Sequence, residues 1–212
     1  MRLATLLFLL ALTALPARAQ TDRAGEFDYY LLSLSWSSAW CTLTGDARDD
    51  PQCDAGRGHT FTVHGLWPQY ETGYPADCRT TQADPTRAQT AAMADIMGGA
   101  GLAFYEWKKH GRCSGLAAAD YFATLRRAHA ALTIPPVFAR ISHDLKIDAG
   151  VIEDAFLESN PRLAPNQITI TCKSGLIQEV RLCLTRDLKP RTCGDDVIRD
   201  CTLQGAELTA VR

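Results

Sequence analysis

Residues 104–113, FYEWKKHGRC, are the stretch from which the rest of the chain can be interpreted. If they form a helix, Glu106 and His110 stand four residues apart and Lys109 follows Glu106 by three. Side chains at these spacings share one helix face. A carboxylate, an ammonium and an imidazole would therefore converge on one side of this helix.

A second short stretch, residues 61–68 (FTVHGLWP), supplies another imidazole. His64 lies at the end of an apolar, strand-like run and just before a predicted Gly-Leu-Trp-Pro bend. Two histidines from separate elements, one of them beside a carboxylate and an ammonium, suit general acid–base catalysis on a phosphate ester. Histidine fits this task because its unperturbed pKa of about 6.5 makes both protonation states accessible near neutral pH.

The first residues of the chain predict export. Arg2 supplies a positive charge, residues 3–15 are almost wholly apolar, and Ala17-Arg18-Ala19 matches a signal-peptide cleavage site. The apolar run is too short to span a bilayer. We therefore expect a signal peptide over residues 1–19 and a mature, secreted or periplasmic protein from about Gln20.

The net charge argues against general binding of nucleic acid. The formal net charge is −2 at pH 7, and loss of Arg2 and Arg18 with the signal peptide would make it −4. A mildly acidic protein holds a polyanion only through a local basic patch. Lys108, Lys109 and Arg112 form the cluster that adjoins the candidate chemistry.

All eight cysteines follow the expected signal peptide. An even number of cysteines in an exported chain favours disulfides, although spacing alone does not choose the pairing. Zinc binding is the alternative, but the chain contains no C-x-x-C or C-x-x-H pair.

Hydrophobic periodicity predicts a mixed fold. Strands are expected at residues 27–36, 59–64, 167–172 and 176–184, the last two forming an antiparallel hairpin through Lys173-Ser174-Gly175. Helices are expected at 85–97, 102–110, 121–132 (capped by Asp120), 136–145 and 148–157, and loops at 40–57, 68–85 and after Pro190. Since no repeat or linker is visible, residues 20–212 are predicted to form one α+β domain with helices packed on a central, mostly antiparallel sheet.

Each candidate residue also has an ordinary structural explanation. A histidine after a strand is more often a structural hydrogen-bonding residue, and Glu-x-x-Lys-His on a helix is usually a solvated charged face. Glu106 and His110 could instead bind a metal, but the H-E-x-x-H pattern is missing. His59, His129 and His143 lack such partners and are expected to be structural or surface residues.

FTVHGLWP and YEWKKHGRC resemble, in order and spacing, the two active-site segments of the ribonuclease T2 family. FDYYLLSLSW resembles the first core strand of that family, and LIQEVRLCL with its flanking cysteines resembles its C-terminal part. The resemblance implies a disulfide-stapled α+β fold and a metal-independent endoribonuclease without a cofactor. Such an enzyme converts single-stranded RNA to a 2′,3′-cyclic phosphate and then slowly to a 3′-phosphate, with low base specificity.

The resemblance also implies roles for single residues. His110 would take the proton of the 2′-OH, and His64 would protonate the leaving 5′-oxygen. Glu106 and Lys109 would stabilise the pentacoordinate phosphorane. Many family members have a phosphate-binding histidine immediately before the glutamate, whereas this chain has Tyr105, which can donate a hydrogen bond but carries no charge at working pH.

The expected base-binding residues rest on the same resemblance. In the family, a tryptophan of the first segment and an aromatic residue shortly after it stack on the base, which indicates Trp67 with Tyr70 or Tyr74. An acidic residue often found after the Trp-Pro pair is Gln69 here, so no particular base preference is implied. A core position beside Pro68 is the alternative for Trp67.

The disulfide pairing implied by the resemblance is Cys41–Cys53, Cys78–Cys113, Cys172–Cys201 and Cys183–Cys193. In the sequence, Cys183 and Cys193 both lie between Cys172 and Cys201. The second pair would anchor the end of the candidate catalytic helix to the loop that follows His64.

Two other functions stay open at the level of sequence. One is a T2-like RNA-binding protein or toxin effector whose role needs no turnover, although both histidines, Glu106 and Lys109 are all present. The other is an exported phosphatase or phosphodiesterase, which would also act on 2′-deoxy substrates. For the ribonuclease we expect a monomer that acts on single-stranded RNA, with no membrane association and no obligatory protein partner.

Overall fold

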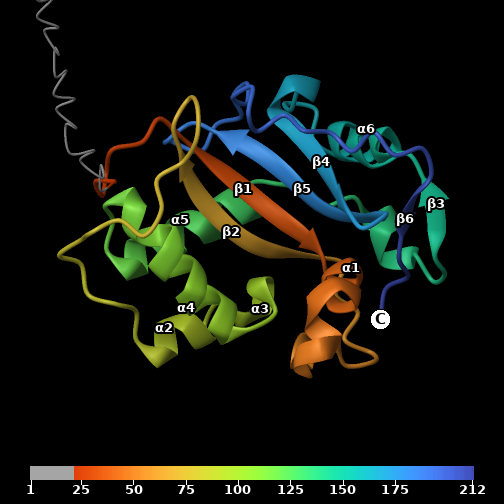
Figure 1. Ribbon diagram of the computed structural model, residues 1–212, viewed down its shortest axis with the longest axis horizontal. Coiled ribbons are helices and arrows are strands. Elements are labelled where there is room, and N and C mark those ends of the chain that lie inside the picture. The colour runs from red at the N-terminus through yellow and green to blue at the C-terminus, as the bar shows by residue number, and fades with distance from the viewer. Residues whose placement is uncertain (1–21) are drawn as a thin grey trace, which may run out of the picture.

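The structure, a computed structural model, describes residues 22–212, so the expected signal peptide lies outside the described residues. Six strands of this part of the chain form one sheet (Figure 1). They are β1 (Tyr29–Trp36), β2 (Phe61–Gln69), β3 (Leu145–Ile147), β4 (Ile168–Lys173), β5 (Leu176–Leu184) and β6 (Ala206–Leu208). Their order is β2-β1-β5-β6-β3, with β4 also paired to β5. Every pairing is antiparallel except the short β5–β6 contact, so the predicted α+β class is confirmed.

Strand β1 is the centre of the sheet and lies between β2 and β5 (Figure 1). All eight of its residues are buried, as its aromatic and apolar sequence predicts. Successive side chains point to opposite faces of a strand. Leu32 and Leu34 accordingly join the main core with the helices, whereas Tyr29 and Leu31 pack in a smaller cluster on the other face.

Strand β2 is longer than the sequence predicted. The bend expected after His64 does not occur, because the strand continues to Gln69 and Pro68 pairs with Tyr30 of β1. Proline is tolerated at this position since β2 is an edge strand, where its missing N–H interrupts no second ladder.

A β-bulge in β2 falls at His64, where the pairing with β1 shifts by one residue. Bulges re-aim side chains and often occur beside active sites. Because of this one, Val63 and Leu66, three residues apart, both face the main core. His64 and Gly65 are left together on the opposite face of the sheet.

The hairpin of β4 and β5 forms as predicted. Ser174 and Gly175 make its two-residue turn, with φ values of 51° and 85°. Positive φ at both central residues is the geometry whose twist matches the flanking strands.

The described residues contain six α-helices: α1 (Ser37–Trp40), α2 (Arg87–Ala91), α3 (Ala94–Met97), α4 (Ala100–Lys109), α5 (Ala118–Ala130) and α6 (Ala149–Ser159). Helices α2 to α5 gather on one side of the molecule, where α4 packs against β2 and α5 packs against β1 and β2 (Figure 1). Helix α6 packs against β4.

Several predicted helices and loops were wrong in detail. Residues 85–97 form two short helices, and α5 begins after Ala117 and is not capped by Asp120. Residues 136–145 form a 3₁₀ helix, Pro136–Arg140, before β3 begins. The expected loop at 40–57 is instead a π-helix, Cys41–Gly45, and two 3₁₀ turns, Asp46–Arg48 and Pro51–Cys53. Helical segments this short are stabilised by tertiary contacts, which local propensity does not record.

Four disulfides join the described residues: Cys41–Cys53, Cys78–Cys113, Cys172–Cys201 and Cys183–Cys193. This is the pairing that the family resemblance implies. Beside the second of them, the backbone N–H of Asp77 donates to the carbonyl of Lys109 at 2.8 Å, so the loop after β2 is held to the end of α4. Within residues 22–212, no helix is both long and apolar enough to cross a membrane.

Candidate active site

His64 projects from the bulge of β2 between two carboxylates. Its Nδ1 lies 2.5 Å from Oε1 of Glu179 on β5, and its Nε2 lies 3.6 Å from Oε1 of Glu106 on α4. Both glutamates are buried, whereas the His64 side chain is 31% exposed. The protein therefore fixes the ring through Glu179 and leaves it accessible to a substrate.

Glu106 enters the site where α4 approaches β2. The indole N–H of Trp67 donates to Oε2 of Glu106 at 2.6 Å. Gly65 makes this close approach possible, because a Cβ at that position would overlap both the indole nitrogen of Trp67 and the carboxylate of Glu106. The side chains of Trp67 on β2 and Glu106 on α4 therefore meet directly above Gly65.

His110 occupies the C-terminal end of α4, where its backbone N–H still donates to the carbonyl of Glu106 at 2.9 Å. Its side chain is buried, and its Nδ1 has no hydrogen-bond partner among the described residues. The His110 ring lies 5.1 Å from the Trp67 ring and 5.9 Å from the Tyr74 ring, between ring centroids. Since Trp67 also lies 5.1 Å from His64, the indole stands between the two imidazoles.

These side chains share one cleft of about 530 Å³. It is lined by His64, Trp67, Glu106, Lys109 and His110, together with Tyr74, Tyr105 and Arg181. The amine of Lys109 lies 5.8 Å from the centre of the Tyr105 ring and makes no hydrogen bond or ion pair within the described part of the chain. Two elements distant in sequence therefore bring all four predicted catalytic residues to one cleft.

The two imidazoles have opposite electrostatic surroundings. Burial acts to lower the pKa of His64, but the hydrogen bond and charge of Glu179 and the charge of Glu106 outweigh it and raise that pKa. Burial lowers the pKa of His110 to about 3, and the positive charges of Lys109 and His64 act in the same direction. These shifts favour the cationic form of His64 and the neutral form of His110. Environments that push two pKa values apart are the mark of an acid and base pair.

The surroundings of Glu106 shift the pKa of its carboxyl upward. Burial raises the pKa of Glu106, although His64, the Trp67 N–H and Lys109 act to lower it. In the structure this carboxyl accepts one hydrogen bond and is shifted toward its protonated form.

Sequence reasoning missed two residues of the site, Glu179 and Arg181. Oε2 of Glu179 accepts from Nε and Nη2 of Arg181 at 2.8 and 2.6 Å. Burial acts to raise the pKa of Glu179, but the hydrogen bond to His64 and the charge of Arg181 outweigh it and lower that pKa to about 2. The sequence contained a pattern that could have identified them. In LIQEVRLCL, Glu179 and Arg181 carry opposite charges two residues apart, so they lie on one face of a mostly buried strand.

The predicted base-binding residues are only partly brought together. Tyr74 and Tyr105 line the cleft, and each is 54% exposed. Tyr70 does not line the cleft: it packs against the main core, and its hydroxyl donates to Asp22 at 3.3 Å. The ring of Trp67 contacts His110 and lies 5.5 Å from the Arg181 guanidinium, so Trp67 is packed among the predicted catalytic side chains.

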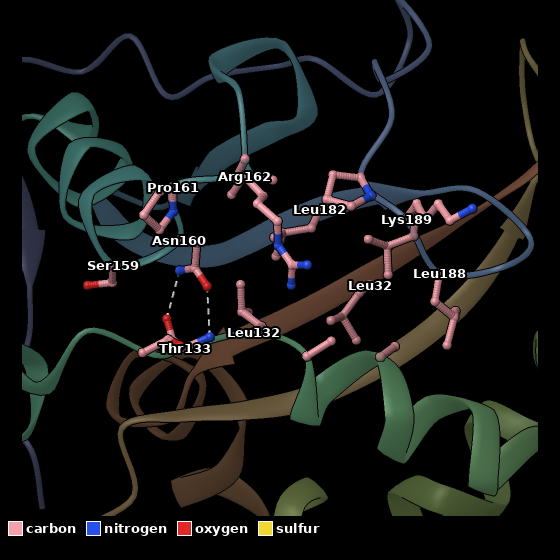
Figure 2. A pocket seen from close by; sticks show the side chains of 15 residues that line it. Leu32, Leu132, Thr133, Ser159, Asn160, Pro161, Arg162, Leu182, Leu188 and Lys189 are labelled. Atoms are coloured by element: carbon pink, nitrogen blue, oxygen red, sulfur yellow. Dashed lines mark hydrogen bonds between the residues drawn. The ribbon is translucent and has the colours of Figure 1, made fainter.

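A separate cavity of about 520 Å³ opens on the other face of the sheet (Figure 2). Leu32, Leu132 and Leu182 are among its apolar lining residues, and Arg162 and Lys189 are its charged ones. It is lined by no histidine and no carboxylate. The candidate acid–base residues of this chain line the other cleft, which holds His64 and His110.

A helix-covered, mostly antiparallel sheet, four disulfides and a cleft with two histidines define a class of disulfide-linked α+β proteins with an acid–base site. A family model described as the ribonuclease T2 family matches residues 27–193, and the chain belongs to that family.

Individual relatives agree with this assignment. A ribonuclease of Aeromonas hydrophila is 45% identical over 98 residues, which are 46% of this chain and 43% of that relative. The match thus spans less than half the length of the curated relative. Among solved structures, the RNase-related protein from Calystegia sepium has a TM-score of 0.64 at 20% identity, and RNase NT in complex with 5′-AMP has 0.62 at 19%. Each alignment covers 88% of this chain and 98% of the other and shows a shared fold.

Proposed function

We propose that the protein is an endoribonuclease that cleaves single-stranded RNA without a metal. The observation that carries the proposal is the pair of imidazoles with opposite pKa shifts, which face one cleft together with Glu106 and Lys109. An acid and a base on either side of a phosphodiester are the requirement for attack by the neighbouring 2′-OH. Single strands are the substrate because in-line attack needs a backbone freedom that an A-form duplex denies.

In the first step, neutral His110 accepts the proton of the 2′-OH, whose oxygen forms a bond to phosphorus. Cationic His64 gives its proton to the 5′-oxygen as the bond from that oxygen to phosphorus breaks. The products are a 2′,3′-cyclic phosphate and a free 5′-hydroxyl. In the second, slower step His64 accepts a proton from water, whose oxygen forms a bond to phosphorus. His110 returns its proton to the 2′-oxygen as the bond from that oxygen to phosphorus breaks, leaving a 3′-phosphate.

Charge on the phosphoryl oxygens is stabilised by Lys109 and Glu106. The amine of Lys109 is not committed to another described residue, and the raised pKa of Glu106 lets its carboxyl donate a hydrogen bond when protonated. Tyr105, at the position where many relatives carry a histidine, supplies a hydroxyl and no charge. Positioned donors of this kind usually account for a large part of the rate enhancement.

Recognition of the base is assigned to aromatic stacking. Tyr74 and Tyr105 are exposed in the cleft, and Trp67 lies beside them. Every base offers a π-face, so stacking supports binding with low base specificity. The 5′-AMP complex described for RNase NT, which shares this fold, supports a nucleotide ligand.

We infer that residues 20–212 act as one domain outside the cytoplasm, in the periplasm or the medium. The apolar leader expected from the sequence and the four disulfides support this location, because disulfides persist in oxidising compartments. A monomer without a protein partner is proposed, since the residues assigned to the reaction come from one chain.

The test uses purified, oxidised protein with excess EDTA. A short single-stranded RNA and its all-deoxy counterpart are incubated with it, and product ends are identified by mass. We expect RNA to be cut to 2′,3′-cyclic ends and DNA to stay intact. Cleavage of the deoxy strand would indicate a phosphodiesterase, and activity lost only with EDTA would indicate a metal site.

The matching variants are His64→Ala and His110→Ala. Each should lower turnover by about 10²–10⁴-fold, the usual contribution of general acid–base catalysis, and leave the circular dichroism spectrum unchanged. His129→Ala is the control, because His129 lies on α5 and outside the cleft. Full activity in either cleft variant would exclude the assigned roles, and folded wild-type protein that binds RNA without cutting it would support the binding-protein alternative.

A further inference from the structure

A polar hollow of about 400 Å³ adjoins the active-site cleft. Arg181 and Arg199 line both the cleft and the hollow, so the two are continuous along one surface. Thr171, Gln178, Asp200 and Thr202 are among the other residues that line the hollow. The reaction assigned above uses neither Arg199 nor this hollow.

The segment that carries Arg199 is held firmly against β4. The Cys172–Cys201 disulfide joins the two, and the backbone N–H of Cys201 donates to the carbonyl of Ile170 at 2.8 Å. The backbone N–H of Arg199 also donates to Thr169 Oγ1 at 3.3 Å. The Cα of Arg199 is therefore fixed, although its side chain is exposed.

The charges in the hollow favour an anion. The guanidinium of Arg199 has no hydrogen bond or ion pair with any residue from 22 to 212, and Arg181 uses only Nε and Nη2 on Glu179. The carboxylate of Asp200 opposes them, but its Oδ1 is occupied by the hydroxyl of Thr169 at 2.6 Å and the N–H of Ile170 at 3.2 Å.

A polar atom in the hollow also lacks a partner. Thr171 Oγ1 is buried and makes no hydrogen bond within the described part of the chain. A hydroxyl can donate to a phosphoryl oxygen, and guanidinium groups bind phosphate through paired N–H donors. The hollow thus offers a cationic rim beside the active-site cleft and, beneath its surface, one unpaired hydroxyl.

We propose that the hollow is a second phosphate subsite, which holds the next phosphodiester of a single-stranded RNA through Arg199, with Arg181 between the two phosphates. The inference rests on the proposed ribonuclease function. It makes RNA longer than a dinucleotide the preferred substrate.

The position of Arg181 also gives the direction of the strand. His64 protonates the 5′-oxygen of the departing nucleotide, so the RNA on the 3′ side of the cut leaves the cleft past His64. Arg181 is joined to His64 through Glu179, and it leads into the hollow. The phosphate bound by Arg199 is therefore the one on the 3′ side of the departing nucleotide.

The test uses substrates with one cleavable bond. A single ribonucleotide followed by a deoxynucleotide is the minimal substrate, and a further deoxynucleotide is added either on its 3′ side or on its 5′ side. Only the bond after the ribonucleotide can be cut, since only there is a 2′-OH present. For the wild-type protein we expect the 3′ extension to raise kcat/KM about tenfold, as one charge-assisted phosphate contact would, and the 5′ extension to raise it little.

Arg199→Ala should abolish the gain from the 3′ extension and leave cleavage of the minimal substrate unchanged. Arg199→Lys should keep part of the gain, because a lysine retains the charge. The control is Arg162→Ala, an exposed arginine beside the cavity on the other face of the sheet. The salt dependence of kcat/KM for the 3′-extended substrate should also become shallower in Arg199→Ala.

Each other result overturns the inference. If Arg199→Ala keeps the gain, or the wild-type protein shows none, the hollow binds no phosphate. If the variant loses a gain that came from the 5′ extension, the assigned direction is wrong. If the wild-type protein cuts neither these substrates nor longer RNA strands, the proposed ribonuclease function is wrong, and the subsite proposal is wrong with it. Cleavage of the minimal substrate without a gain from the 3′ extension would instead contradict the subsite alone.

Discussion

The Nδ1 atom of His64 lies 2.5 Å from a carboxylate oxygen of Glu179, whose second oxygen accepts two hydrogen bonds from Arg181. A buried carboxylate held from both sides fixes the orientation of the imidazole and stabilises its positive charge. The Nδ1–H is engaged in this contact, so in the proposed mechanism Nε2 carries the proton that is transferred. We therefore assign Glu179 as a positioning residue for the general acid.

Glu179→Gln tests this assignment through pH. The proposed mechanism requires protonated His64, so activity should fall as pH rises through the His64 pKa, which Glu179 raises above its ordinary value. Without the carboxylate, burial and Arg181 would lower that pKa. The alkaline limb of the kcat/KM profile should then move to lower pH by about 1–2 units, with a smaller loss of rate at acid pH.

The control for this variant is Asp95→Asn, which breaks an exposed carboxylate–arginine pair with Arg126 on the helices. It should leave the pH profile unchanged. An unshifted alkaline limb in folded Glu179→Gln protein would mean that Glu179 has only a structural role.

At the scale of elements, the site depends on how closely α4 approaches β2. The bulge at His64 places Gly65 on the same face as His64, and the indole of Trp67 meets the carboxylate of Glu106 over that glycine. Strand and helix can interlock there only because no side chain stands between them.

Gly65→Ala should separate Trp67 from Glu106, because the new Cβ overlaps both. Shifts of about 1 Å in catalytic groups can cost about 100-fold in rate, and overpacking of this kind costs about 1–3 kcal/mol of stability. Steady-state kinetics and chemical denaturation measure the two effects. Gly101→Ala is the matched control on α4, since nothing lies within 4 Å of its added Cβ; equal activities of the two variants would refute the importance of this contact.

At the scale of the whole molecule, Cys78–Cys113 ties the loop after β2 to the end of α4, so that one bond spans both active-site segments. Its cysteines are 35 residues apart, against 12 for Cys41–Cys53. Closing the longer loop removes more conformational entropy from the unfolded chain.

Replacement of Cys78 and Cys113 by serine should lower the free energy of unfolding by about 3–4 kcal/mol, measured by guanidinium denaturation. Turnover should fall as well, since the C-terminal end of α4 carries Lys109 and His110. Replacement of Cys41 and Cys53 should cost about 3 kcal/mol and leave kcat unchanged. Unchanged kcat in both would show that the bond after α4 contributes stability alone.

The sequence by itself determined the α+β class, the buried central strand, the β4–β5 hairpin and the identity of four side chains in the cleft. These features rest on short-range patterns: alternation along a strand, turn residues, and spacings within one segment. Because these patterns are local, they predicted a β2 that was too short and one helix over residues 85–97 where the structure has two. Edge position made Pro68 acceptable in a strand, and packing interrupted the helical pattern; neither is a local property.

Only the tertiary structure decided the directions in which the pKa values of the two histidines shift. Glu179 is 115 residues from His64 in sequence, and the pairing of β1 with both β2 and β5 brings them together across the sheet. The same folding excluded Tyr70 from the cleft and brought Arg199 to its edge. Spacing in a sequence identifies groups able to exchange protons, but burial and distant charges set their pKa values, and these exist only once the chain is folded.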